Sequence, residues 1–147
     1  MPTAARLVAA LMLGALGWEI AGWISPVLPA SVRMAPQAAP WIGGGLGLVV
    51  GWRLGRHPAR GLLAWAGQGL TLVAVLVFWM LLTCATLLMG ALSLRGRYDT
   101  PLEALEAAVR LMGEMAGPLL APRALGLLLA WALLTGLVTG LARRWWR

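Results

Sequence analysis

Four long apolar stretches, separated by short segments that carry arginine, constrain this chain more than any other feature. They lie at residues 4–24, 39–55, 62–92 and 118–142. About 18 apolar residues in a helix are enough to cross the ~30 Å hydrocarbon core of a bilayer. A helix also satisfies its own backbone hydrogen bonds in lipid, whereas a barrel strand would alternate polar and apolar residues, and these stretches do not. The sequence therefore predicts an all-α fold, a small polytopic helical membrane protein with four transmembrane helices.

The composition leaves no room for a soluble domain beside these helices. Of the 147 residues, 61% are hydrophobic, and the mean hydropathy is +0.82. Such values exclude an ordinary soluble globular domain, so residues 1–147 are expected to form a single membrane domain. The first stretch is longer than the apolar core of a typical signal peptide, and no small-x-small cleavage site follows it closely. It is therefore expected to remain as a transmembrane helix.

The charge pattern indicates membrane topology and argues against nucleic-acid binding. All twelve basic residues are arginine and the net charge is +7, but the arginines flank the apolar stretches and form no single basic face. Arginine is enriched on the cytoplasmic side of transmembrane helices. With four spans, more arginines share a side with the termini than lie on the other side, which predicts both termini in the cytoplasm. The first group is Arg6, Arg53, Arg56, Arg60, Arg143, Arg144 and Arg147, and the second is Arg33, Arg95, Arg97, Arg110 and Arg123.

The second stretch is the shortest of the four predicted spans. Its apolar core at residues 41–52 covers only about 20 Å as a helix. Four prolines between residues 25 and 40 predict a loop before it. This stretch crosses the membrane only if the bilayer thins or if Arg53 extends toward the headgroups. A three-span arrangement, with this segment re-entrant, is the alternative.

Small residues recur every four positions in the second and fourth stretches. Residues four apart share one face of a helix, and a face without side chains lets another helix approach closely. We therefore expect the second helix to pack against the fourth or the first within the monomer, with a different subunit or a second copy as the alternative. The positions are Gly43, Gly47, Gly51 and Gly55 in the second stretch, and Ala132, Gly136 and Gly140 in the fourth.

Residues 101–116 predict a short amphipathic helix on the membrane surface. Thr100 to Glu103 fit a capping box, with Thr100 as the N-cap. Apolar residues then recur on one face and charged residues on the other, where Arg110 has acids four positions away on both sides. This helix is expected to rest on its own protein or on lipid, and docking on a partner is the alternative. The apolar positions are Leu102, Leu105, Val109, Met112 and Met115 or Ala116; the charged ones are Glu103, Glu106, Arg110 and Glu114.

Glu19 is the only acidic residue inside a predicted span. An ionisable side chain in a membrane is costly and is usually paired or functional. Helical rise places Glu19 about two-thirds of the way across the first span, and Arg123 enters the fourth span from that far side to a similar depth. The sequence therefore predicts a Glu19–Arg123 ion pair that locks the first and fourth spans together. A proton or ion pathway is the alternative.

No arrangement of residues indicates catalysis, a metal site or a cofactor. Met80, Cys84 and Met89 offer soft sulfur ligands, but methionine and cysteine are also ordinary apolar side chains. His57 is the only histidine and has no acid near it, and no triad or phosphate loop is present. We therefore predict a protein that is not an enzyme and uses no cofactor. Its expected partners are bilayer lipids, with other membrane subunits or a second copy as further candidates.

Several stretches, in order along the chain, resemble a known family. They are MPTAARLVAA at residues 1–10, GLGLVVGW at 45–52, GLT at 69–71 with LVFW at 76–79, and RYDTPLEAL at 97–105, followed by a C-terminus rich in arginine and tryptophan. Together they resemble the tellurium-resistance membrane proteins called TrgA, of photosynthetic and related bacteria. The resemblance implies a multi-span protein of the bacterial inner membrane that is linked to tellurite resistance. It implies no catalytic or ligand residue.

Two functions are consistent with these observations. The first is a resistance protein that restricts oxyanion uptake, aids export or alters the electron flow that reduces tellurite. The second is an accessory or assembly subunit of a photosynthetic, respiratory or transport complex, which packs through its glycine-rich helix face. An export path would need polar groups within the spans, and the sequence offers few: Glu19, Gln68, Thr71, Thr83, Thr86, Thr135, Thr139 and Arg123.

Overall fold

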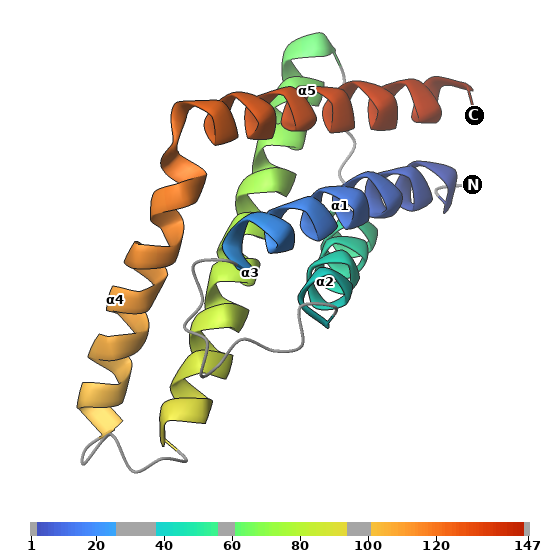
Figure 1. The fold of residues 1–147 in the computed structure, drawn as a ribbon. Coiled ribbons are helices and arrows are strands. Elements are labelled where there is room, and N and C mark those ends of the chain that lie inside the picture. The colour runs from blue at the N-terminus through green and yellow to red at the C-terminus, as the bar shows by residue number, and fades with distance from the viewer. Residues whose placement is uncertain (1–2, 26–37, 56–60, 94–100, 146–147) are drawn as a thin grey trace.

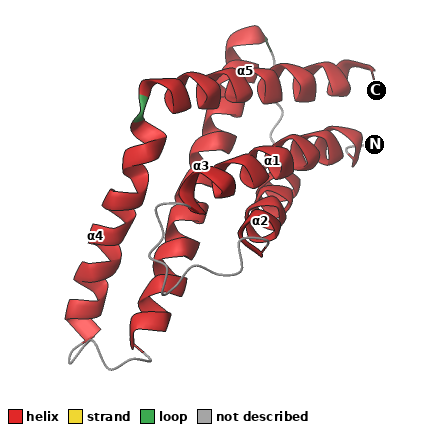
Figure 2. Ribbon diagram, in the orientation of Figure 1, coloured by secondary structure: helices red, strands yellow, loops and turns green. Residues whose placement is uncertain are grey.

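The structure, a computed structural model, describes residues 3–25, 38–55, 61–93 and 101–145, which form α-helices and no strand (Figures 1 and 2). The predicted all-α class is thereby confirmed for the described residues. Three of the helices contain segments that are long and apolar enough to cross a membrane: Ala4–Ile24, Leu63–Gly90 and Pro122–Ala142. The helices are α1 Thr3–Ile24, α2 Ala38–Leu54, α3 Leu62–Ser93, α4 Pro101–Leu120 and α5 Pro122–Trp145.

The sequence predicted four spans, and three of the helices qualify as candidate spans. Helix α2 is only 17 residues long, shorter than the candidate segments in α1, α3 and α5. Its length agrees with the short apolar core seen in the sequence, and length alone does not decide whether it crosses.

The boundary between α4 and α5 differs from the predicted one. We predicted that the amphipathic helix ends near residue 116 and the fourth span begins at 118, but α4 continues through Pro118 to Leu120. The chain bends at Ala121, whose backbone N–H bonds to the Pro118 carbonyl at 3.4 Å. Pro122 disfavours helical geometry at the residue before it and then begins a new helix, because its missing N–H needs no partner there. The second proline of the pair therefore sets the break.

The helices contact one another around a shared apolar core, some of them side by side and others crossing. Helix α4 runs beside the C-terminal part of α3 and contacts it, and α5 turns away after Ala121 to cross the N-terminal part of α3 (Figure 1). Helices α1 and α5 are in contact and run in opposite directions, so the N-terminal end of α1 and the C-terminal end of α5 lie on the same side of the molecule (Figure 1).

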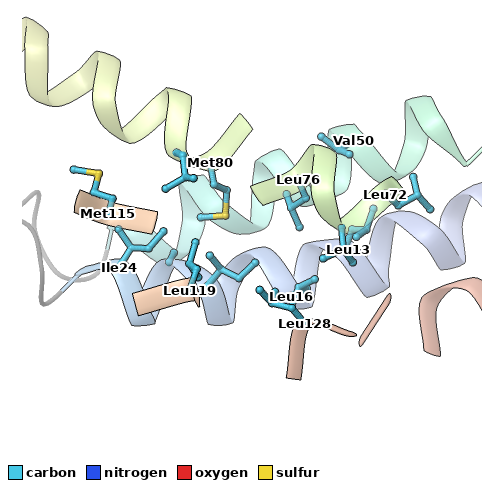
Figure 3. Packing of buried hydrophobic residues seen from close by; sticks show 14 of the residues in the cluster. Leu13, Leu16, Ile24, Val50, Leu72, Leu76, Met80, Met115, Leu119 and Leu128 are labelled. Atoms are coloured by element: carbon cyan, nitrogen blue, oxygen red, sulfur yellow. The ribbon is translucent and has the colours of Figure 1, made fainter. Parts of the chain in front are cut away.

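All five helices contribute to one apolar core (Figure 3). Leucines of α1 and α3 are almost fully buried at its centre because they recur every three or four residues and so share one helix face. Met80 is 2% exposed within this core, and the half-buried Cys84 packs against the core. The labelled side chains are Leu13, Leu16, Ile24, Val50, Leu72, Leu76, Met80, Met115, Leu119 and Leu128.

Candidate functional site

The glycine face of α2 lies directly on the backbone of α1. A Cβ atom built on Gly43 would overlap the carbonyl of Gly17, and one on Gly47 would overlap the carbonyl of Leu13. At Gly51 the added atom would lie 2.5 Å from the Cα of Ala10. Because the contacts pair rising residue numbers in α2 with falling numbers in α1, the two helices are antiparallel. Only glycine permits this approach along the whole contact.

Gly55 lies at the last step of the same contact. A Cβ there would lie 3.2 Å from the Cβ of Ala9 and 3.5 Å from the Cα of Arg6. At the opposite end, the rings of Trp18 and Trp41 meet edge to face with centroids 5.0 Å apart. The α1–α2 contact therefore runs from Arg6 to Trp18 on α1, most of the length of that helix.

The small face of α5 packs on α3 and not on α2. A Cβ on Gly136 would overlap the carbonyl of Trp65, one on Gly140 would overlap the Trp65 indole, and one on Gly69 would overlap the carbonyl of Ala132. These contacts are confined to one turn of α3, where α5 crosses it (Figure 1). The sequence pattern missed Gly69 and Trp65, although a glycine inside a long apolar helix was the available signal.

The predicted Glu19–Arg123 ion pair is absent from the described structure. Both side chains are exposed, whereas Arg110 and Glu114 of α4 do form an ion pair, at 3.2 Å. Glu19 lies on the outward side of α1, next to the exposed Trp18, whereas Leu16 and Ile20 face the core. Arg123 is the second residue of α5, because that helix begins at Pro122. Glu19 therefore lies on the outward side of α1, and Arg123 lies at the first turn of α5 instead of several residues inside a span.

Most polar side chains of the long helices are satisfied by their own helix. The hydroxyls of Thr71, Thr83 and Thr86 donate to the carbonyls four residues earlier, at 2.9, 2.8 and 2.7 Å. The buried Thr139 hydroxyl donates to the carbonyls of Thr135 and Gly136. Each such bond uses the one hydrogen of the hydroxyl, so that this hydrogen is not available to donate to an anion.

Three buried polar atoms have no hydrogen-bond partner within the described residues. They are Arg6 Nε on α1, Gln68 Nε2 on α3 and Thr135 Oγ1 on α5. Each comes from a different helix, and these three helices contact one another in pairs. An unpaired buried polar group is costly, so these atoms mark the places where a water molecule or a ligand could bind.

The side chains that could bind a metal form no metal centre in the part of the chain that the structure describes. No group of three or more His, Cys, Asp or Glu side chains in these segments could hold a metal ion. His57 and the predicted N-cap Thr100 lie outside the described residues.

Helix α4 places its two halves in different surroundings. Its C-terminal half packs on the core, with Met115 and Leu119 each 3% exposed. In its N-terminal half the predicted apolar stripe faces outward, since Leu102, Leu105 and Val109 are 69%, 59% and 64% exposed. The predicted stripe therefore meets the core only toward its C-terminal end, and in the N-terminal half the less exposed side chains are Ala107, Ala108 and Leu111.

A shallow groove of about 420 Å³ lies on the outer side of the α1–α2 pair. We call it the outer groove. Its walls are apolar over most of their length, and a tryptophan and an arginine lie at its end. The lining side chains include Leu7 and Leu11 of α1 and Leu48, Val49, Trp52 and Arg53 of α2.

The arrangement offers close helix contacts, a few unpaired buried polar atoms and an apolar groove with a cation at its end. Nothing in this geometry assembles a nucleophile, a base and an oxyanion site of the kind that hydrolytic catalysis requires among the described residues. Comparisons of the chain with protein-family models, with curated proteins and with solved structures find no match.

Proposed function

We propose that this chain is a non-enzymatic protein of the bacterial inner membrane that supports tellurite resistance without itself conducting the oxyanion. The stretches that resemble the TrgA family, in the same order along the chain, support the link to tellurite. The observation that carries the mechanism is the threonine bonding: Thr71, Thr83, Thr86 and Thr139 all donate to carbonyls of their own helices. A path for a hydrated oxyanion would need such groups free to line it.

We further propose that α2 crosses the membrane as a fourth span. It accompanies α1 from Arg6 to Trp18, so a bilayer that covers this part of α1 also covers α2. The directions of the helices support the same topology. Three spans made of α1, α3 and α5 would leave α1 and α5 parallel, whereas they run in opposite directions (Figure 1). An even number of crossings also keeps both termini on one side, as the arginine bias predicts.

The test of the resistance role is deletion of the gene in its native host. Tellurite tolerance and tellurite uptake are measured in the deletion strain and after the gene is restored. We expect the deletion to lower tolerance and restoration to recover it. A doubly substituted chain, Gln68→Leu with Thr135→Val, removes the unpaired polar atoms of α3 and α5 and should restore tolerance equally well. If that variant is present in the membrane but restores nothing, a polar path through these residues is required and the proposed mechanism fails.

An accessory subunit of a larger membrane complex is the second candidate, and α4 is the observation that favours it. Leu102, Leu105 and Val109 are exposed on a helix outside the three candidate spans. The glycine-rich face of α2 cannot serve such a partner, because α1 already occupies it. Affinity purification from native membranes in mild detergent, with mass spectrometry, decides between the two. A stoichiometric partner that is lost on Leu105→Gln supports the subunit role, whereas a chain that purifies alone favours the self-contained resistance protein.

A further inference from the structure

The outer groove has one polar end and one apolar end. Gly51 packs on Ala10 and Gly55 lies near Arg6, so the antiparallel register brings Arg53 to the level of Leu7. Further along, Leu48 lies against Gly14, with its Cγ 3.1 Å from the position of a Cβ there. The groove therefore extends from Arg53 and Trp52 along about one and a half helical turns of apolar wall.

The charge at the polar end is not balanced by an acid of the same two helices. No acidic side chain lines the groove as described, and α2 contains none. The acid of α1 is Glu19, twelve residues beyond Leu7 and so about 18 Å away along the helix. The backbone of Arg6 also lies near this end, with its Cα 3.5 Å from the position of a Cβ on Gly55, although Arg53 is the arginine that lines the groove.

These features match a phospholipid. A guanidinium binds a phosphate through paired hydrogen bonds, and an indole such as that of Trp52 favours the headgroup level of a bilayer. An acyl chain attached to that phosphate would extend along the wall formed by Leu7, Leu11, Leu48 and Val49, all partly exposed to the surroundings. Uncompensated arginine favours a headgroup with net negative charge over a zwitterionic one.

We propose that the outer groove is a binding site for one anionic phospholipid, with its phosphate on Arg53 and an acyl chain along the α1–α2 wall. The site requires only that α1 and α2 lie in a bilayer. It is independent of the proposed role in tellurite resistance, so either proposal can fail without the other.

Native mass spectrometry of the purified chain, titrated with phosphatidylglycerol or phosphatidylcholine, tests the site. We expect one phosphatidylglycerol to bind more tightly than phosphatidylcholine. Loss of a charge-assisted phosphate contact in Arg53→Gln should weaken phosphatidylglycerol binding about tenfold and remove the preference between the lipids. Val49→Trp, which fills the apolar wall, should weaken the binding of both lipids.

Two variants serve as matched controls. Arg144→Gln removes an exposed arginine at the C-terminal end of α5, and Leu129→Trp places an indole on the exposed side of α5, where Leu129 is 52% exposed. Both should bind lipid as the unaltered chain does. Helix content by circular dichroism and a single elution peak identify variants that have folded.

Any of three results would overturn the proposal. The first is a folded Arg53→Gln variant with unchanged preference for phosphatidylglycerol, and the second is a Leu129→Trp variant with the same loss as Val49→Trp. The third is a dimer in detergent that dissociates on Val49→Trp while lipid binding stays unchanged, which would assign the groove to a second copy of the chain.

Discussion

At the scale of single residues, glycine has two distinct roles in this chain. Gly47 holds the α1–α2 contact because any side chain there would enter the backbone of α1, whereas a Cβ on Gly45 would meet no atom within 4 Å. Both glycines lie in the interior of the same apolar helix. Spacing in the sequence identified the first kind, since it follows the four-residue repeat and Gly45 does not.

Gly47→Ala and Gly45→Ala should therefore change stability in opposite directions. Alanine favours a helix over glycine by up to about 1 kcal/mol, so Gly45→Ala should be neutral or slightly stabilising. The same methyl group at Gly47 must push α1 and α2 apart, at a cost of roughly 1–3 kcal/mol. Thermal unfolding of the two variants in one detergent measures the difference. Equal melting temperatures would show that α1 and α2 do not pack this closely.

Residue patterns also explain why the predicted ion pair failed. Glu19 and Arg123 were placed at equal depth by counting residues from assumed helix ends, and an error of four residues at the start of α5 turns Arg123 through more than a full helical turn. Counting also says nothing about which way a side chain faces. Glu19 lies beside Ile20, which is fully buried, and yet it faces outward.

At the scale of the elements, helix type and helix face were predictable and helix partners were not. Apolar length identified α1, α3 and α5, and helical periodicity indicated that α4 is an amphipathic helix. The small face of α5 was visible at Gly136 and Gly140, but spacing describes one surface and cannot name the opposing one. The partner is Trp65 of α3, and it was fixed by the paths of all the helices together.

Attachment of α5 to α3 should be as sensitive as the α1–α2 contact. Gly136→Ala places a methyl group against the Trp65 carbonyl, whereas Gly126→Ala on the same helix meets no atom within 4 Å. We expect Gly136→Ala to destabilise the fold by roughly 1–3 kcal/mol and Gly126→Ala to leave it unchanged. Limited proteolysis together with thermal unfolding measures this. Identical behaviour of the two variants would contradict the α3–α5 packing.

Helix α4 should depend on its buried half and not on its surface ion pair. The Arg110–Glu114 pair is 83% and 57% exposed, and exposed pairs of this spacing contribute at most a few tenths of a kcal/mol. Met115 is 3% exposed, so Met115→Ala should cost roughly 2–5 kcal/mol, while Arg110→Gln should leave stability unchanged. Unfolding measurements on both variants decide the matter. A larger loss for Arg110→Gln would mean that α4 is held by its charged face.

At the scale of the whole molecule, helix directions contain information that no single stretch provides. Hydropathy finds three candidate spans and does not include α2, whose 17 residues lie at the lower limit for crossing a bilayer. Helix α2 is antiparallel to α1, and α5 runs opposite to α1 (Figure 1). Four alternating crossings produce both relations, whereas alternating crossings of α1, α3 and α5 alone would leave α1 and α5 parallel.

The number of crossings can be measured from the two segments of the chain that precede and follow α2. In a Cys84→Ala background, single cysteines are introduced by Ser31→Cys before α2 and by Ala59→Cys after it. If α2 crosses, a membrane-impermeant maleimide applied to intact spheroplasts should label Ser31→Cys and reach Ala59→Cys only after lysis, because the arginine bias places the segment around residue 59 in the cytoplasm. If α2 is re-entrant, both positions lie on one side and respond alike. That result would mean that the chain has three spans, with its termini on opposite sides of the membrane. Alternating crossings would then no longer explain why α1 and α5 run in opposite directions.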